Sequence, residues 1–389
     1  MRTYTASRTA KLVVAFDSSG IHRIGTPGDF ASGEWLSAEA SIAGALVSRM
    51  TVAVNHTIVD EAYLVSGDLR VDGFPMFDSP PTLDKGVSGS LVLNEHVGDI
   101  GYLDLPPNSA SIKNMRFEKI RRATSHSALV VSTRVTGESL APINAQYYEE
   151  PFGPPVLLVA GANHELLNAR AQDCLPITVV SRHHRKLSAS YNVEAIISSD
   201  IDTAPALYIV TPRTGWWESV AERAGGLVAW LAGVEAAVHM RSQNILKCPV
   251  RAYATCGHEL GHLGLAELLK LDKSITHSDK PILHLGANLG CASNTALFLR
   301  AADIKQALLM RELLLVEGYP DKRIHVESID VVSGEGYDLA KHGAKVLSMA
   351  GANSHFHAAS DRWPGNVSSE GISAIARAVA KWVTLTASK

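Results

Sequence analysis

The stretch Val250-Arg-Ala-Tyr-Ala-Thr-Cys-Gly-His-Glu-Leu-Gly-His-Leu-Gly-Leu265 joins an apolar run to a glycine and then to imidazole and carboxylate side chains. The run from Val250 to Ala254 is typical of a short buried strand, and Gly257 ends it. In an open α/β sheet, ligands bind just beyond the carboxyl ends of the strands. We therefore predict that His258 and Glu259, which follow Gly257 directly, lie at a ligand site.

The same residues also fit other descriptions. His258-Glu-Leu-Gly-His262 is an H-E-x-x-H motif, which on a helix places two imidazoles on one face with a glutamate between them. Gly261 inside the motif disfavours the long helix that such a zinc site requires. The histidines could instead be ordinary core or helix-end residues. Cys256 could be a buried structural thiol or a nucleophile.

Composition excludes several classes of protein. The chain has 389 residues, of which 46% are hydrophobic and 19% charged, as in soluble globular proteins with more than one domain. A net charge of −3 gives no indication of a nucleic-acid or anionic-membrane partner. The first residues contain no apolar signal core, and the four cysteines have no zinc-finger spacing. These features predict a reduced, cytoplasmic setting.

The pattern of apolar runs changes twice along the chain. Residues 180–389 alternate strand-like and helix-like segments, which is typical of a mainly parallel sheet covered by helices on both faces. Residues 58–178 have short apolar runs between Pro/Gly/Ser turns, with one helix expected over about Ile112 to Thr124. We predict one discontinuous α/β domain, residues 1–57 plus 180–389, interrupted by a β-rich insert. Lys11–Phe16 is predicted as a strand and Ala292–Ala302 as a helix.

Several motifs occur in the order found in one known family. His22-Arg-Ile-Gly-Thr-Pro-Gly-Asp29 is similar to the N-terminal Arg-x-x-Gly-Thr-Pro-Gly element of the di-zinc aminopeptidases. Residues 98–167 resemble a protease-associated domain, and Tyr191-Asn-Val-Glu-Ala-Ile-Ile197 is similar to the strand that re-enters the catalytic domain. The chain thus resembles a zinc aminopeptidase with a protease-associated insert, in the transferrin-receptor-like arrangement. The resemblance implies an α/β fold with a mainly parallel mixed sheet flanked by helices.

The resemblance also implies a set of metal ligands. Glu222-Arg-Ala-Gly-Gly226 stands in place of the family's Asp-Asn-x-Ser-Gly, so Glu222 replaces the bridging aspartate. His258-Glu259 replaces a Glu-Glu pair that supplies a general base and then a ligand. Phe356-His-Ala-Ala-Ser-Asp361 matches the element with the last histidine ligand, which gives His357. The implied ligands are Glu222, His258, Glu259 and His357.

Two ligands of the family pattern are missing. Thr211–Trp217 lacks the expected His-x-Asp, and Gly286–Gly290 contains no carboxylate. Two zinc ions need a bridging carboxylate and several anionic ligands, so we predict at most one zinc or other divalent transition ion. Arg213 falls where a ligand is missing. We expect its guanidinium to pair with Glu222 or Glu259.

Two functional hypotheses follow. The first is hydrolysis of an amide or peptide-like bond in a small substrate, with Glu259 and His357 holding a metal ion close to Glu222. His258 would then be a ligand or carry protons, and Arg213 would bind a substrate carboxylate or the developing oxyanion. The second is a metal-free binding or scaffold protein that keeps the fold and uses the insert for contacts in a homo-oligomer.

Overall fold

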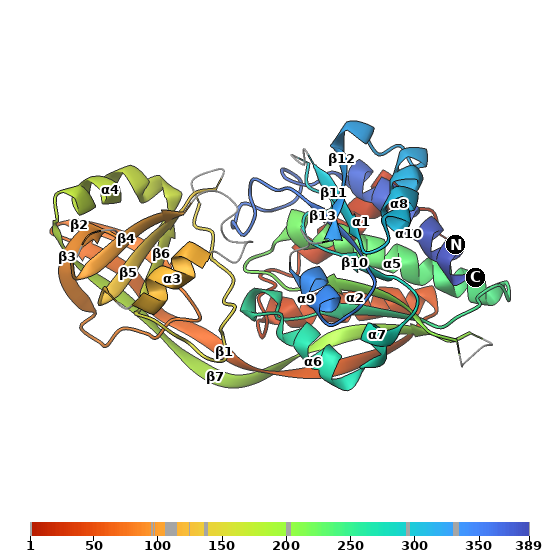
Figure 1. The fold of residues 1–389 in the computed structure, drawn as a ribbon, viewed down its shortest axis with the longest axis horizontal. Helices are drawn as coiled ribbons and strands as arrows, with labels where there is room; N and C mark the ends of the chain where they lie inside the picture. The colour runs from red at the N-terminus through yellow and green to blue at the C-terminus, as the bar shows by residue number, and fades with distance from the viewer. Residues whose placement is uncertain are drawn as a thin grey trace.

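The computed structural model describes residues 2–94, 96, 98–105, 115–123, 125–135, 139–199, 204–292, 296–329 and 334–388. Figure 1 shows an elongated molecule with a β-rich part on the left and a larger α/β part on the right, where both termini lie. Two long strands, β1 (Leu46–Ser66) and β7 (Pro176–Ile197), run through both parts. They pair antiparallel over nearly their whole length and join the two parts into one ribbon of backbone hydrogen bonds.

The larger part is built on a mixed sheet in the order β1-β7-β9-β8-β10-β13-β11-β12. Its further strands are β8 (Leu207–Pro212), β9 (Val250–Thr255), β10 (Ile282–Leu285), β11 (Leu297–Ala301), β12 (Ile324–Ser328) and β13 (Val346–Gly351). Strands β9, β8, β10 and β13 are parallel neighbours, and β11 is parallel to β12, while β7 runs antiparallel to β9 and β11 runs antiparallel to β13. The predicted α/β fold with a mainly parallel mixed sheet is confirmed.

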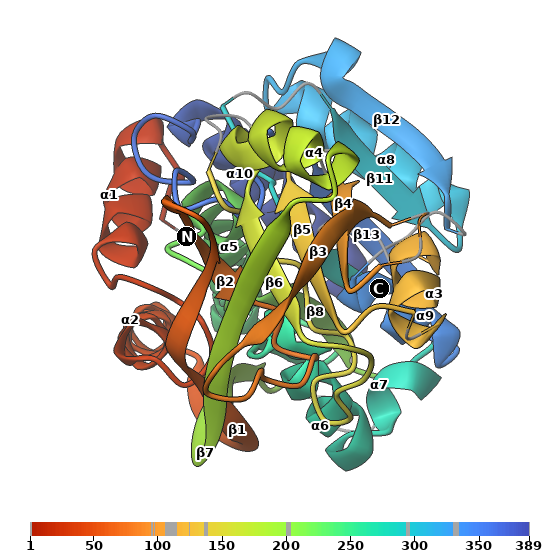
Figure 2. The ribbon, with the colours of Figure 1, turned by 90° about the vertical axis from the view of Figure 1, so that its left-hand side faces the viewer.

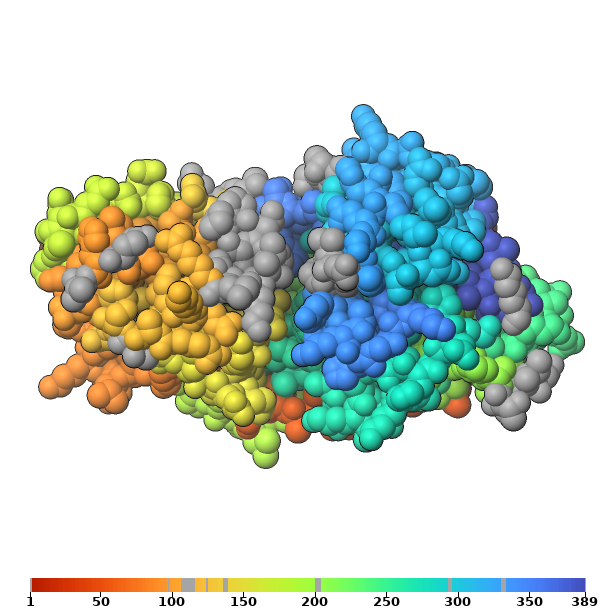
Figure 3. Space-filling view, in the orientation of Figure 1, coloured from red at the N-terminus to blue at the C-terminus, as the bar shows by residue number. Residues whose placement is uncertain are grey.

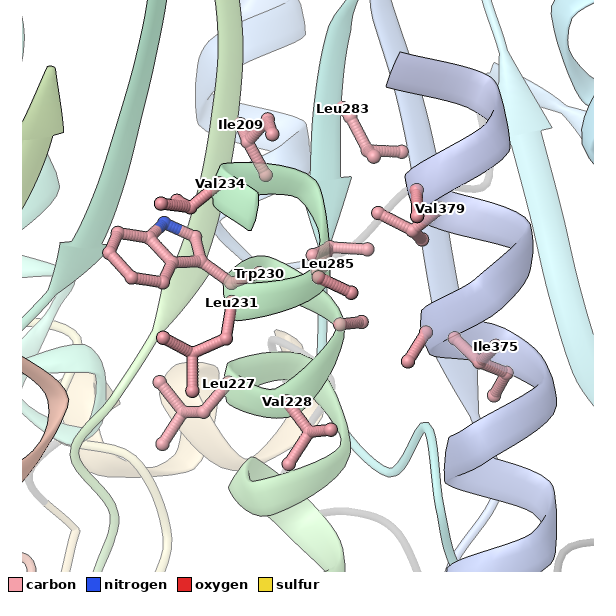
Figure 4. Close-up of a cluster of buried hydrophobic side chains, with 14 of the residues drawn as sticks. Ile209, Leu227, Val228, Trp230, Leu231, Val234, Leu283, Leu285, Ile375 and Val379 are labelled. Atoms are coloured by element: carbon pink, nitrogen blue, oxygen red, sulfur yellow. The ribbon is translucent and has the colours of Figure 1, made fainter. Parts of the chain in front are cut away.

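Helices cover both faces of this sheet, and alternate side chains of β8 are therefore buried on opposite sides. Leu207 and Ile209 contribute to the core under α5 (Val220–Ser242) and α10 (Ser369–Ala387), whose side chains meet those of β8 and β10 in Figure 4. Tyr208 and Val210 contribute to the core on the other side. The elements there are α6 (Leu263–Leu271), α7 (Ser274–His277) and α9 (Glu335–Lys341), and α1 (Ala6–Asp17), α2 (Pro27–Ala43) and α8 (Ile304–Val316) complete the first layer.

The β-rich part closes on itself. Its strands are β2 (Leu69–Pro75), β3 (Val87–Leu93), β4 (Ile100–Leu105), β5 (Ala128–Thr133) and β6 (Val156–Ala160), with helices α3 (Met115–Ala123) and α4 (His164–Gln172) outside them. The pairings run β1-β2-β6-β5-β4-β3-β7, and the pairing of β7 with β1 completes a ring (Figure 2). One apolar core of this part draws on residues between 62 and 179 only. The boundaries predicted for the insert fall inside β1 and β7, because both strands continue from one part into the other.

Two local predictions are wrong. Lys11–Phe16 lies in helix α1, where the buried residues Thr9, Leu12, Val13 and Phe16 recur at helical spacing and Thr5 caps the first turn. In the stretch Ala292–Ala302, which was expected to be helical, residues 293–295 lie outside the described part of the chain. The described part contains strand β11, whose buried and half-buried side chains alternate. The expected helix Ile112–Thr124 is observed as α3, and its remaining residues also lie outside the description.

None of the helices in the described ranges is both long and apolar enough to cross a membrane.

Candidate functional site

The parallel strands β8, β9, β10 and β13 end at one edge of the sheet. Arg213 follows β8, His258 follows β9, and His357 lies in the loop after β13. This edge faces the β-rich part, because Nδ1 of His357 contacts the carbonyl oxygen of Pro142 at 2.8 Å. Figure 3 shows the two parts in contact along this boundary, with the segment around α9 at the surface of the larger part. The fold therefore brings the loops that carry the predicted residues to one place.

Two glycines let helix α5 begin unusually close to the strand ends. A Cβ atom on Gly225 would lie 2.8 Å from the backbone nitrogen of Gly290, and one on Gly226 would lie 2.6 Å from Oγ1 of Thr211. Real Cβ atoms do not come so close, so a larger residue would push the helix away from the sheet. The Gly-Gly pair of the Glu-Arg-Ala-Gly-Gly motif thus places Glu222, one turn earlier, at the sheet edge.

The first turn of α5 is anchored by Asp361, which lies in the loop after His357. Its two carboxylate oxygens each accept a backbone N–H at 3.0 Å, from Ala221 and Glu222. Burial raises the pKa of Asp361 to about 7, although these two N–H groups and the Asn366 side chain favour the charged form. Asp361 therefore caps the helix from a distant loop and links the position of His357 to that of Glu222.

Glu222 and Arg223 form a buried ion pair. Nη2 of Arg223 lies 2.6 Å from Oε1 of Glu222, and the two side chains are 1% and 0% exposed. The contact does not have hydrogen-bond geometry, but Nε of Arg223 donates to the carbonyl oxygen of Thr214 at 2.6 Å. Burial raises the pKa of Glu222 above its ordinary value, and the adjacent guanidinium opposes that rise. A fixed positive charge thus stands beside the carboxylate that the resemblance assigned to a metal.

His357 faces the same carboxylate. Its Nε2 lies 3.6 Å from Oε1 of Glu222, and its Nδ1 must carry the proton because the carbonyl of Pro142 can only accept. Burial and the charge of Arg223 lower the pKa of His357 to about 3, so the ring is neutral at physiological pH. Nε2 therefore presents a lone pair, and it has no hydrogen-bond partner among the described residues.

Glu259 is held by hydrogen bonds at both oxygens. Oε1 accepts from the backbone N–H of Ile24 and Oε2 accepts from the hydroxyl of Thr214, each at 2.7 Å. Burial raises the pKa of this carboxyl, against the hydrogen bonds that favour its charged form. Thr214 is thus the link between Glu259 and Arg223, since its hydroxyl binds the first and its carbonyl binds the second.

His258 lies in a turn and not on a helix. Residues His258–Leu260 form a 3-10 turn, and Gly261 and His262 have positive φ angles, so α6 begins only at Leu263. The hypothesis of a helical H-E-x-x-H zinc site is wrong, because these left-handed residues interrupt the helix that it requires. Nδ1 of His258 lies 3.3 Å from Oε1 of Glu335. Burial, followed by the charge of Arg223, holds the pKa of His258 well below its usual value.

Arg213 pairs with a different residue from those expected. Its Nη1 lies 2.5 Å from Oδ1 of Asp29 in helix α2, and the guanidinium also donates to the carbonyl oxygens of Asp29 and Tyr191. The prediction of Glu222 or Glu259 as the partner is wrong. The acidic partner, Asp29, lies near the start of the chain. The spacing of motifs within residues 206–260 could not indicate a partner so distant in sequence. Arg213 joins α2 to β7.

Three residues of the cluster were not predicted. Arg223 could have been found, because it stands in the second position of the same Glu-Arg-Ala-Gly-Gly motif. His284 lies inside the predicted strand β10, with Nδ1 2.9 Å from Oγ of Ser348, and burial lowers its pKa to about 3. Glu335 accepts a hydrogen bond from Thr255 at 2.6 Å, and nothing in the sequence around it signals this role.

Cys256 is not suited to nucleophilic chemistry. Its thiol is fully buried, and burial raises its pKa to about 12, so the reactive thiolate is scarce at neutral pH.

The residues at this edge do not fit a pair of zinc ions. Within the described ranges, no group of three or more His, Cys, Asp or Glu side chains is arranged to hold a metal. The physical reason is visible at Glu222, where a guanidinium lies in contact with the carboxylate that would have to bridge two dications. Glu259, the second carboxylate, already accepts a hydrogen bond at each oxygen.

No protein-family model and no curated protein matches this sequence. Solved structures do match over almost the whole chain. An aminopeptidase from Aneurinibacillus sp. strain AM-1 has a TM-score of 0.72 at 15% identity, covering 99% of this chain and 94% of its own. BSAP, a zinc aminopeptidase from Bacillus subtilis, has a TM-score of 0.74 at 14% identity, covering 97% and 94%. A peptidase M28 precursor from Shewanella amazonensis SB2B has a TM-score of 0.69 at 16% identity, covering 98% and 96%. The chain has the fold of the zinc aminopeptidases, as the resemblance of its sequence predicted.

Proposed function

We propose that the protein binds a small peptide-like molecule at the sheet edge around Arg223, and that it does so without a zinc pair. The fold supports the class of ligand, because its neighbours are named as aminopeptidases and peptidases. The composition of the site supports the absence of a zinc pair, since a guanidinium lies against Glu222 and the one histidine that faces this carboxylate, among the described residues, is His357. This proposal is the metal-free binding protein of the second hypothesis, and it now names the residues of the binding site.

One observation carries the proposal, namely a cluster of buried polar atoms without hydrogen-bond partners among the described residues. They are Nη1 and Nη2 of Arg223, Nε2 of His284 and Nε2 of His357. The carboxylate of Glu222 belongs to the same cluster, although the side chain of Ser219 lowers its pKa as a hydrogen-bond donor. Buried polar atoms are nearly always satisfied, because an unsatisfied one costs about 1–3 kcal/mol. A site that presents both donors and acceptors suits a ligand that itself has both, as a peptide or an amino acid does.

The β-rich part closes this site from one side. Its segment 141–146 touches the edge at three places: the carbonyl of Pro142 binds His357, the side chain of Asn144 accepts from Trp216 at 2.9 Å, and the N–H of Ala145 donates to the carbonyl of Glu259 at 2.8 Å. We propose that residues 58–178 act as an insert domain of the protease-associated type that covers the ligand. Three contacts from one segment support this role, because a ligand held beneath them is shielded from water.

Hydrolysis of an amide bond is the second candidate function. It is supported by the fold and by the contact between Glu222 and His357, two side chains that can accept protons, at 3.6 Å. In this alternative Glu222 or His258 would activate water and Arg223 would stabilise the oxyanion. Arg213 and Glu259 take structural roles in both proposals, since Arg213 is paired with Asp29 and both oxygens of Glu259 accept hydrogen bonds.

The test uses the full chain and a library of free dipeptides. The melting temperature is recorded with each dipeptide, and the mixtures are then analysed by mass spectrometry for released amino acids. Binding stabilises the folded state by mass action, so a dipeptide that raises the melting temperature and stays intact supports the binding protein. Release of amino acids by the purified wild type would favour the hydrolase. A library without any stabilising member contradicts the proposed binding.

A further inference from the structure

The guanidinium of Arg223 has more donors than its surroundings use. An arginine carries five N–H groups, and Nε uses one of them on the carbonyl of Thr214. Nη1 and Nη2 have no hydrogen-bond acceptor in the described part of the chain, although Glu222 lies in ionic contact. The side chain is 1% exposed, so bulk water does not solvate these groups. Leaving buried N–H groups without acceptors is costly, even though Glu222 balances the charge.

Arg223 brings a permanent positive charge to this edge, because a guanidinium stays protonated in proteins. Its position is fixed by the carbonyl oxygen of Thr214 and by the contact with Glu222. A guanidinium in this position repels a dication, and it attracts a planar anion.

On the basis of the proposed peptide-like ligand, we infer that Arg223 is a fixed cation that excludes zinc and binds the carboxylate of the ligand through Nη1 and Nη2. The planar fork of an arginine matches the two oxygens of a carboxylate, and such pairs are about twice as strong as neutral hydrogen bonds. The lone pair on Nε2 of His357 then remains for an N–H group of the same ligand. The ligand class is a free amino acid or short peptide with an unblocked carboxyl terminus.

The experiment compares the dipeptide library with the same library prepared as C-terminal amides. The best free dipeptide and its amide are titrated by calorimetry into the wild type and three variants. Arg223→Lys keeps the charge and loses the fork, whereas Arg223→Met loses both. Arg121→Met is the matched control, because Arg121 forms an equally buried pair with Asp78 at 3.0 Å within the β-rich part. Zinc content after dialysis is measured on the wild type.

The expected result is binding of the free dipeptide with at least about tenfold lower affinity for the amide, which is the effect of losing one good charged contact. Arg223→Lys should weaken binding by a similar factor, Arg223→Met should abolish it, and Arg121→Met should leave it unchanged. If Arg223→Met does not fold, the lysine variant and the amide comparison carry the test. Equal binding of acid and amide overturns the inference and leaves the proposed function standing. If no dipeptide binds, both the inference and the proposed function are wrong. If the wild type retains a stoichiometric amount of zinc after dialysis, the inference is wrong.

Discussion

Nη2 of Arg223 lies 2.6 Å from Oε1 of Glu222, although the two residues are consecutive in the first turn of α5. Successive residues of a helix do not normally face each other, so the surroundings hold this pair together. The carbonyl of Thr214 directs the guanidinium toward the strand ends, and the glycines one turn later bring the helix close to them. The pair is therefore held together by the tertiary structure. It supplies one positive and one negative group to the site.

Loss of one member of this pair should destabilise the fold strongly. We expect Arg223→Met to lower the free energy of unfolding by about 3–5 kcal/mol, because it leaves a buried carboxylate without its countercharge. Urea titration of the purified variant measures the effect. In the double variant Glu222→Gln/Arg223→Met a large part of the loss should be restored, since no buried charge remains. An Arg223→Met variant as stable as the wild type would show that Glu222 is uncharged or solvated.

Arg213 should behave as a structural residue. Replacing it with methionine leaves Asp29 buried and unpaired, and we expect a loss of about 3–5 kcal/mol in unfolding free energy. Arg213→Lys should recover only part of it, because lysine cannot serve Asp29, Tyr191 and Ser190 together. The dipeptide affinity of Arg213→Lys, measured by calorimetry, should equal that of the wild type. A loss of dipeptide affinity in Arg213→Lys without a loss of stability would show instead that Arg213 takes part in binding.

Thr214 should contribute through its hydroxyl. In Thr214→Val the shape is kept, but Glu259 loses a donor at one oxygen and the N–H of Gly257 loses its acceptor at 2.8 Å. We expect a loss of about 1–3 kcal/mol in unfolding free energy. Thr214→Ser keeps both hydrogen bonds and serves as the control, with a much smaller change. Chemical denaturation of Thr214→Val and Thr214→Ser measures the two unfolding free energies. Equal values would contradict the role assigned to the hydroxyl.

His22 should make the fold sensitive to acid. Its ring is buried and stacked on Phe16 at 3.8 Å between ring centres, and burial lowers its pKa from 6.5 to about 4 despite two carbonyl neighbours. Below pH 6.5 the unfolded chain takes up a proton that the folded ring does not, so stability falls as the pH drops toward 4. Relative to His22→Gln, the wild type should lose about 3 kcal/mol of unfolding free energy between pH 7 and pH 4.

The comparison with His22→Gln removes the contribution of all other titrating groups that the two proteins share. The difference between the two unfolding free energies should be constant above pH 7. A difference that stays constant down to pH 4 would show that His22 takes up a proton as readily in the folded protein as in the unfolded chain, which contradicts the prediction.

The sequence alone determined the architecture, because buried strands and amphipathic helices have periods that are local properties of the chain. The run Val250–Ala254 became β9, and the alternation over residues 180–389 became a mainly parallel sheet between two helical layers. Local periodicity was misleading in two short stretches, Lys11–Phe16 and Ala292–Ala302. Lys11–Phe16 was predicted as a strand and is helical, because its buried residues follow the spacing of α1. Ala292–Ala302 was predicted as a helix and contains strand β11.

The sequence also pointed to Glu222, His258, Glu259 and His357, and the structure links them through Arg223 and Thr214. Only the tertiary structure decided what these residues contact. Asp29 pairs with Arg213 across 184 positions of sequence, and Pro142 of the β-rich part fixes the proton of His357 from 215 positions away. The balance of charge at the site depends on such distant partners and on burial, and neither is encoded in the spacing of a motif. For that reason the sequence could predict that these residues lie at one edge of the sheet, while the fold determined that the guanidinium of Arg223 lies against Glu222.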